Sequence, residues 1–310
     1  GLKELFEEVA PIKDQTEEIE LYFLDYYFDE PKYDEEIAWL KDLTFEAPLR
    51  AKVKLVNKKT KESDEAEIYL GDFPAMTSRG TFIINGVEMV VVSQLIRSAG
   101  VYFTASVYRG KKFFGAKIIP DRGSWLEFST EPDGFIGVKI DRHRKAAVTD
   151  LLRVFASMYG KTELESDESL IKLFSGTDNN AVKFIEATLK KSPAKSAMDS
   201  YVEIYKRLRP SDLATPENAK SLIDAMFLRA DRYGLSRSGR FKVDQRLRGE
   251  SKRKENKENK DNYLLSPEDL VLIIKEIIRL NNNPLAEPDD IDHLGNRRVK
   301  SVGELLQNRL

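Results

Sequence analysis

Basic residues stand beside aromatic residues in the middle of the chain, and this composition is typical of a surface that binds nucleic acid. Arg122 stands three residues before Trp125, and two lysines precede Phe113 and Phe114. Lysine and arginine neutralise phosphates, and exposed rings stack on unpaired bases. The alternative is that the rings are buried. We expect burial for the two phenylalanines, whereas the pattern leaves both options open for Trp125.

Residues for covalent or metal catalysis are missing from the sequence. It contains no cysteine and two histidines, His143 and His293, so a thiolate nucleophile is excluded and a histidine-built metal site is disfavoured. No glycine-rich phosphate loop occurs. The acidic cluster Asp289, Asp290 and Asp292 is more typical of caps and ion-pair partners than of two-metal catalysis. We expect no catalytic residue, metal or cofactor in this chain.

Length and charge narrow the class of protein. With 310 residues, the chain has room for about two domains. The net charge of −2 excludes a uniformly basic nucleic-acid binder, but residues 1–47 carry a net −11 and the remainder carries +9. This asymmetry favours separate faces for different partners, although ordinary solvated surface explains it as well. No apolar run approaches the ~18–20 residues that cross a bilayer, so we expect no membrane partner.

The first third of the chain is predicted to be rich in strands. A helix is expected at 2–10 and an extended aromatic segment at 21–28. Apolar residues alternate with basic ones from 49 to 55, which predicts a half-buried strand and a hairpin over 48–70 with a polar turn at 57–65. Asn85-Gly86 joins two β-branched runs, and this dipeptide favours a tight hairpin turn.

The rest of the chain is predicted to change from strands to helices. Strands are expected at 101–108, 112–119, 124–128 and 135–140, and helices from 144 onward and at 165–174, 178–191, 195–207, 216–228, 267–281 and from 301. Residues 246–262 are almost purely polar, so we expect a mobile surface loop there, with a nucleic-acid-binding tail as the alternative. Together these segments predict an α+β fold in two domains.

Several segments resemble the β subunit of bacterial DNA-directed RNA polymerase. The tract DDIDHLGNRRVKSVGELLQN at 289–308 is close to diagnostic of that family. Further matches, in chain order, are IYLGDFPAMTSRGTFIINGVEMVVVSQLIRSAGVYF (68–103), AKIIPDRGSWLEF (116–128), VKIDRHRK (138–145), IYKRLRPSD (204–212), NAKSLIDAMF (218–227) and RYGLSRSGRFKV (232–243).

The resemblance implies that the chain is a piece of a longer subunit. Residues 1–96 are expected to form the first part of the protrusion domain, 97–292 the lobe inserted into it, and 293–310 the return to the protrusion. The family's catalytic aspartates and Mg²⁺ belong to the β′ subunit, so this piece would position DNA in a cytoplasmic, nucleoid-associated nucleotidyltransferase. The implied partners are DNA, the β′, α and σ subunits, and transcription factors.

The resemblance also implies roles for individual residues. In the family, the matching tryptophan stacks on an unpaired base of the non-template strand, and the matching Asp and Arg of the 289–308 tract line a pocket for a flipped guanine. A carboxylate suits guanine because it accepts hydrogen bonds from N1–H and N2–H₂. Residues expected on this strand are Arg97, Trp125, Ile291, Asp292, Arg297, Arg209 and Arg232. A supporting basic patch is expected at Lys117, Arg122, Arg142, Arg144 and Lys145.

Two further surfaces follow from the resemblance. The protrusion edge docks CarD-type regulators and the transcription-repair coupling factor in the family, and the docking tripeptide aligns with Ser63, Asp64 and Glu65, of which only the glutamate is kept. Val92 matches the edge of the rifampicin pocket, whose main cluster would lie beyond this chain, whereas Met89 replaces a common arginine. Ala99 replaces the proline of the Arg-Ser-Pro-Gly-Val motif.

Two other hypotheses belong to different functional classes. A module that only docks regulators would use the 63–65 edge and contact DNA little. A free-standing DNA-binding protein is disfavoured by the acidic overall charge. We therefore expect a non-catalytic part of RNA polymerase that holds the non-template strand and the downstream DNA.

Overall fold

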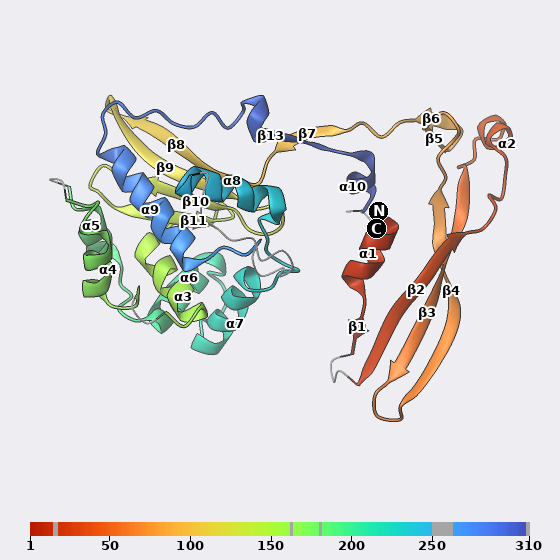
Figure 1. Ribbon diagram of the computed structural model, residues 1–310, viewed down its shortest axis with the longest axis horizontal. Helices are drawn as coiled ribbons and strands as arrows, with labels where there is room; N and C mark the ends of the chain where they lie inside the picture. Colours follow the sequence, from red (N-terminus) through yellow and green to blue (C-terminus); the bar gives the residue numbers. More distant parts are fainter. Residues whose placement is uncertain (15–17, 162–163, 180–181, 250–262, 308–310) are drawn as a thin grey trace. The chain divides into compact units, whose positions relative to one another are not determined.

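The computed structural model describes residues 1–14, 18–161, 164–179, 182–249 and 263–307 (Figure 1). The chain forms two compact units. Unit 1 comprises Gly1–Ile96 and Val299–Leu310, and unit 2 comprises Arg97–Arg298. The return to unit 1 therefore follows residue 298, six residues beyond the expected boundary. The chain crosses between the units in β7 (Gln94–Arg97) and β13 (Arg297–Lys300), and these two strands pair with each other.

Unit 1 is built on an antiparallel sheet with the order β1-β2-β3-β4. Buried and more exposed residues alternate along the first half of β3, as the sequence predicts, and the ring of Phe6 in α1 stacks on Phe23 in β2 at 4.7 Å. The strands span Ile12–Lys13, Ile19–Phe28, Glu46–Asn57 and Glu62–Pro74, and α1 spans Leu2–Val9.

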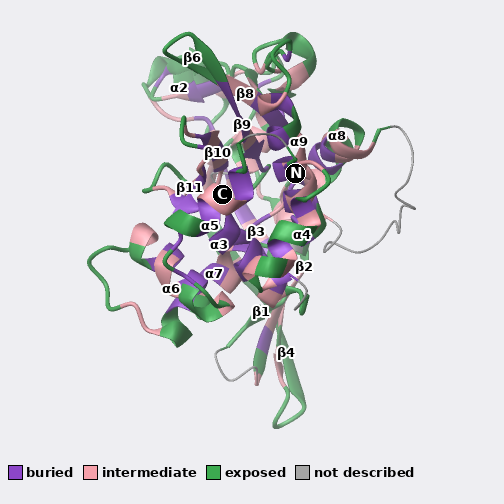
Figure 2. Cartoon of the chain, turned by 90° about the vertical axis from the view of Figure 1, so that its left-hand side faces the viewer, coloured by how far each residue is buried: buried purple, intermediate pink, exposed green. Residues whose placement is uncertain are grey.

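The β3–β4 hairpin differs from the prediction at its turn. Only residues 58–61 connect the strands, and Lys61 has a φ of +58°. Ser63, Asp64 and Glu65 are thus strand residues of β4, not turn residues. They pair with the backbone of β3, and the Glu65 carboxylate lies 3.4 Å from the Lys54 ammonium. Ion pairs across the strands replace apolar burial here, and the hairpin tip is exposed (Figure 2).

The other described elements of unit 1 are a short hairpin and the helices α2 and α10. Asn85 and Gly86 both adopt positive φ in the turn between β5 (Phe82–Ile84) and β6 (Val87–Met89), as predicted. A small core of Ala38, Phe45 and Ile83 joins this hairpin to α2 (Glu35–Leu40), a helix that the sequence did not predict. The return segment forms α10 (Val302–Gln307).

Unit 2 contains an antiparallel sheet with the order β12-β11-β10-β9-β8. One face of this sheet packs on helices, of which α9 contacts β9 most extensively (Figure 1). Phe113 and Phe114 are buried, which confirms that prediction. The strands span Gly100–Tyr108 (β8), Lys111–Ile119 (β9), Leu126–Thr130 (β10), Ile136–Ile140 (β11) and Ala146–Ala147 (β12).

The helices of unit 2 confirm most predictions, with three differences. The helix that was predicted from residue 178 begins at Phe184, where the Asp178 carboxylate accepts hydrogen bonds from the N–H groups of Phe184 and Ile185. The first residues of the predicted mobile loop, 246–248, form the end of α8, a helix that the sequence did not predict. Residues 250–262 of that loop lie outside the described residues. The predicted helix from 144 begins only at Val148, after β12. The helices are α3 (Val148–Met158), α4 (Asp167–Phe174), α5 (Phe184–Lys191), α6 (Ala197–Leu208), α7 (Pro216–Phe227), α8 (Ser236–Arg248) and α9 (Pro267–Asn281).

The fold class is the predicted one, because helices and sheets occur in both units. The large apolar core lies between the sheet and helices of unit 2 (Figure 2). Among the described helices, none combines the length and the apolar character needed to cross a bilayer.

Candidate nucleic-acid interface

An exposed cluster of charged residues joins the two ends of unit 2. The Asp292 carboxylate accepts hydrogen bonds from the guanidinium groups of Arg97 at 3.2 Å and Arg297 at 2.9 Å. The Asp292 side chain is 60% exposed. Hydrogen bonds from Arg297 and Arg97 lower the pKa of Asp292, so this carboxylate stays ionised. All of these hydrogen bonds fall on Oδ1, and within the described residues Oδ2 accepts none.

Local hydrogen bonds hold the segment that carries Asp292. The Asp290 carboxylate accepts from the N–H groups of Asp292 and His293. The Asn296 side chain donates to the Asp290 carbonyl at 2.6 Å, and His293 Nδ1 accepts from Gly295 N–H. This network shapes the short 3-10 helix Leu294–Asn296. Asp290 therefore closes the turn that precedes this helix, whereas His293 is the N-cap of the helix. Asp289 and Asp292 are ion-pair partners, one of the two roles that the sequence predicted for this acidic cluster.

The same segment is fixed to the sheet of unit 2. Asp289 and Phe103 exchange hydrogen bonds at the edge of β8, and the Arg246 guanidinium contacts both Asp289 and Glu276. The Arg298 guanidinium lies 3.0 Å from Asp121. The segment that carries the cluster is thus tied to unit 2 by contacts from Phe103, Arg246 and Asp121.

Trp125 lies in a loop just before β10, and its indole is half-buried. The backbone N–H of Trp125 donates to the Asp141 carboxylate at 2.7 Å, and the backbone carbonyl of Trp125 accepts from the Asp141 N–H. Nearby, Arg122 pairs with Gly234 through the backbone. Arg232, two residues before Gly234, is exposed. Trp125 and Arg232 are therefore held on neighbouring segments.

Arg209 is the C-cap residue of α6. It follows α6, in the helical layer of unit 2 (Figure 1), and its guanidinium lies 3.4 Å from Asp212. Ile291 is half-buried next to Asp292 in the 289–298 segment.

The predicted basic patch is divided between several segments. Lys117 pairs with Glu127 at 3.3 Å and Lys145 pairs with Glu131 at 3.1 Å, so much of their charge is balanced. Both lysines line a hollow of 210 Å³ on the sheet. Arg122 donates instead to the Asp231 carbonyl, and Arg142 and Arg144 are exposed in the turn after β11.

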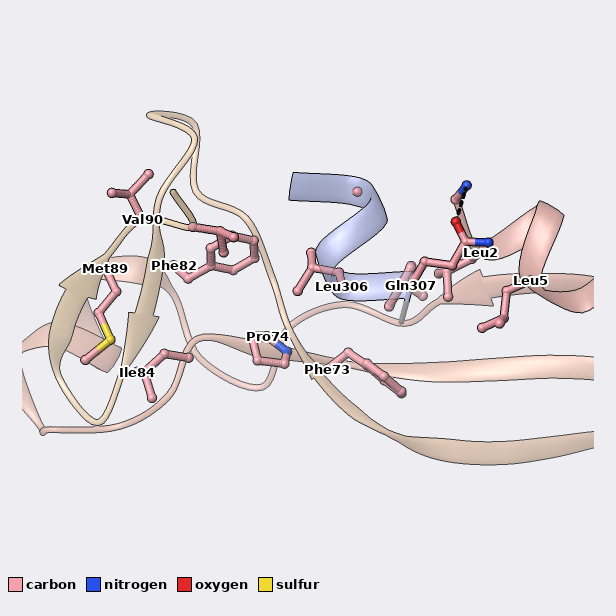
Figure 3. A pocket seen from close by; sticks show the side chains of 14 residues that line it. Leu2, Leu5, Phe73, Pro74, Phe82, Ile84, Met89, Val90, Leu306 and Gln307 are labelled. Atoms are coloured by element: carbon pink, nitrogen blue, oxygen red, sulfur yellow. Dashed lines mark hydrogen bonds between the residues drawn. The ribbon is translucent and has the colours of Figure 1, made fainter. Parts of the chain in front are cut away.

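Unit 1 contains an apolar cavity of 570 Å³ (Figure 3). The side chains that line it come from α1, β4, β5, β6 and α10, and Met89, Val90 and Val91 are among them. Val92, the expected pocket edge, follows this lining and is 72% exposed.

Sequence reasoning missed the contribution of α8 to this interface. The Lys242 ammonium donates to the Gly295 carbonyl at 2.8 Å and so ties α8 to the 289–298 segment. The helix was missed because Arg240 and Val243 are buried in an otherwise charged segment. The spacing of Arg240, Asp244 and Arg248, four residues apart, is the signal that could have identified it.

Comparisons of the sequence with known proteins show the family to which the chain belongs. Residues 97–300 match the family described as RNA polymerase Rpb2, domain 2, and the chain belongs to this family. Over its whole length it is 45% identical, across 328 aligned positions, to the DNA-directed RNA polymerase subunit beta of Chloroflexus aggregans. The chain spans 27% of that relative's length. The predicted resemblance to the bacterial β subunit is therefore confirmed.

Proposed function

We propose that this chain is part of a bacterial RNA polymerase β subunit and that unit 2 holds the non-template DNA strand and the downstream DNA during transcription. In this proposal, the chain supplies no catalytic group, and Mg²⁺ is bound by β′. Its partners are DNA and the β′, α and σ subunits in the cytoplasm. The family membership and the relative's name support the enzyme context.

The single observation that carries the DNA contact is the geometry at Asp292. Two arginines occupy Oδ1 and hold the carboxylate ionised, while Oδ2 accepts no hydrogen bond from the described residues. A flipped guanine offers N1–H and N2–H₂ as donors on its base-pairing edge. Oδ2 is thus suited to accept from guanine, and Arg97 and Arg297 are suited to contact O6 or phosphate.

Removal of the Trp125 indole should weaken binding of a DNA bubble. The half-buried ring belongs to a residue whose backbone is held by Asp141, and base–aromatic stacking contributes about 1–3 kcal/mol. In a polymerase whose β subunit contains this chain, Trp125→Ala should raise the Kd for bubble DNA about five- to a hundredfold.

Trp39→Ala is the matched control for this experiment. Trp39 is 65% exposed and lies on α2 of unit 1. The Kd should be unchanged in this variant. Equal Kd values for wild type and Trp125→Ala across salt concentrations would refute the stacking role.

A specific feature of unit 1 supports factor docking as a second candidate function. β4 is an edge strand, and its first half is exposed. Its unpaired backbone groups suit strand addition by a partner. Ser63, Asp64 and Glu65 lie on this edge, and the Glu65 side chain is 63% exposed.

Glu65→Lys should weaken binding of a CarD-type regulator or of the transcription-repair coupling factor. The substitution places two like charges opposite each other, because Lys54 faces position 65. We expect a severalfold rise in regulator Kd, measured by titration with each purified factor. Glu62→Lys, at the start of β4, is the control. Unchanged regulator binding in Glu65→Lys would exclude this edge as the docking surface.

A further inference from the structure

Arg237, Phe241 and Gln245 form an exposed ridge along α8. The aromatic residue of this ridge, Phe241, takes part in none of the contacts described above. Phe241 is 66% exposed. Arg237 lies four residues earlier, which places it one turn away on the same side of the helix. Gln245 continues the ridge. Among the described residues, the Arg237 guanidinium has no ion-pair partner. A single exposed aromatic ring is common on protein surfaces and does not by itself indicate a binding site. A binding role for Phe241 therefore depends on where α8 places it.

The middle of α8 is held next to the Asp292 segment. A Cβ added at Gly239 would lie 2.7 Å from Ala99 Cβ, so the helix backbone approaches the start of β8 closely. Lys242, adjacent to Phe241, donates its hydrogen bond to the Gly295 carbonyl. Phe241 is therefore near the segment that carries Asp292.

The start of α8 is held next to the Trp125 segment. Gly234 exchanges backbone hydrogen bonds with Arg122, at 3.0 Å and 3.2 Å, two residues before the helix begins. Trp125 follows Arg122 by three residues. The ridge of α8 thus extends between the two places where the proposed function puts unpaired bases.

We infer that Phe241 and Arg237 form a further contact for the unpaired strand, in which Phe241 stacks on a base and Arg237 neutralises the adjacent phosphate. This inference rests on the proposed function. The ridge combines a cation, a ring and an amide, and the acidic residue next to it on the helix, Asp244, is already paired with Arg240 and Arg248. Such a ridge is complementary to single-stranded nucleic acid.

The test uses a polymerase reconstituted with a β subunit that contains this chain, and bubble DNA with 2-aminopurine at successive unpaired positions of the non-template strand. Phe241→Ala should raise the Kd about five- to a hundredfold and remove the quenching at one position. Phe241→Tyr should bind like wild type, and Phe241→Leu should bind like Phe241→Ala, because leucine is apolar but cannot stack. Ile171→Ala, at an exposed position of α4, is the control and should change nothing.

Salt dependence tests the role of Arg237 separately. Arg237→Gln should reduce the slope of log K against log salt by about 0.7, the value for one phosphate contact on a single strand.

Three results would overturn the inference. Equal binding by the leucine and tyrosine variants would indicate packing, not stacking. A loss of enzyme assembly in Phe241→Ala with unchanged DNA affinity would indicate a protein partner. If Phe241→Ala binds DNA like wild type and Trp125→Ala binds more weakly, the inference about Phe241 is wrong but the proposed function stands. If both variants bind like wild type, the stacking part of the proposed function is wrong as well.

Discussion

Asp292→Ala should reduce the preference of the polymerase for guanine at one unpaired position of the non-template strand by about 1–3 kcal/mol. Oδ2 has no protein donor among the described residues, and guanine supplies two donors on one edge. Adenine lacks this pair of donors, so its binding should change little. The measurement is the Kd for bubble DNAs that differ only in that base.

The pKa of Asp292 adds a second expectation. Hydrogen bonds from Arg297 and Arg97 lower this pKa, so the carboxylate stays ionised across neutral pH. The guanine preference should therefore be constant between about pH 6 and pH 8. Asp133→Ala removes another exposed carboxylate that pairs with a lysine and should leave the preference intact. A preference that survives Asp292→Ala would exclude this residue as the guanine acceptor.

Asp269→Asn should lower the free energy of unfolding of this chain by about 3–5 kcal/mol, because it breaks a buried ion network. Asp269 is fully buried at the start of α9 and accepts hydrogen bonds from Arg240 at 2.6 and 2.8 Å and from Arg248 at 2.7 Å. Loss of the charge leaves Arg240 and Arg248 with Asp244 as their one remaining carboxylate among the described residues. Urea unfolding measures the difference, and Asp244→Asn, at a more exposed position of the network, should cost less.

The same network makes stability depend on acid pH. Burial opposes ionisation of Asp269, but hydrogen bonds from Arg240 and Arg248 outweigh it and lower the pKa to about 2. The ordinary aspartate pKa is about 3.9. The stabilisation is therefore complete above about pH 4 and is lost as the pH falls toward 2. Asp269→Asn should lose less stability than wild type over this interval, and equal losses would contradict the assignment.

Strands were predicted well where one face is buried and the turn is specified. Alternation defined β3, and Asn85-Gly86 adopts the positive φ values that its hairpin needs. The prediction was wrong at Ser63–Glu65, because residues of an edge strand can be stabilised by ion pairs with no apolar pattern. It also missed α8, whose buried face contains Arg240 in place of an apolar residue.

Periodicity could not have predicted the candidate site. Arg97 and Asp292 are far apart in the sequence and meet because β7 and β13 pair and bring the two ends of unit 2 together. Only the family resemblance pointed to them. The hydrogen bond from Lys242 to the Gly295 carbonyl could not be predicted from the sequence, because a backbone carbonyl is present at every residue and requires no particular side chain.

The most direct test of the central claim is photocrosslinking from 6-thioguanine placed in the non-template strand of a bubble bound to the assembled polymerase. Mass spectrometry would identify the attached peptide. We expect crosslinks to the peptides that contain Asp292 and Arg297, and we expect these crosslinks to disappear in Asp292→Ala. Crosslinks confined to other subunits, with none in residues 97–298, would contradict it.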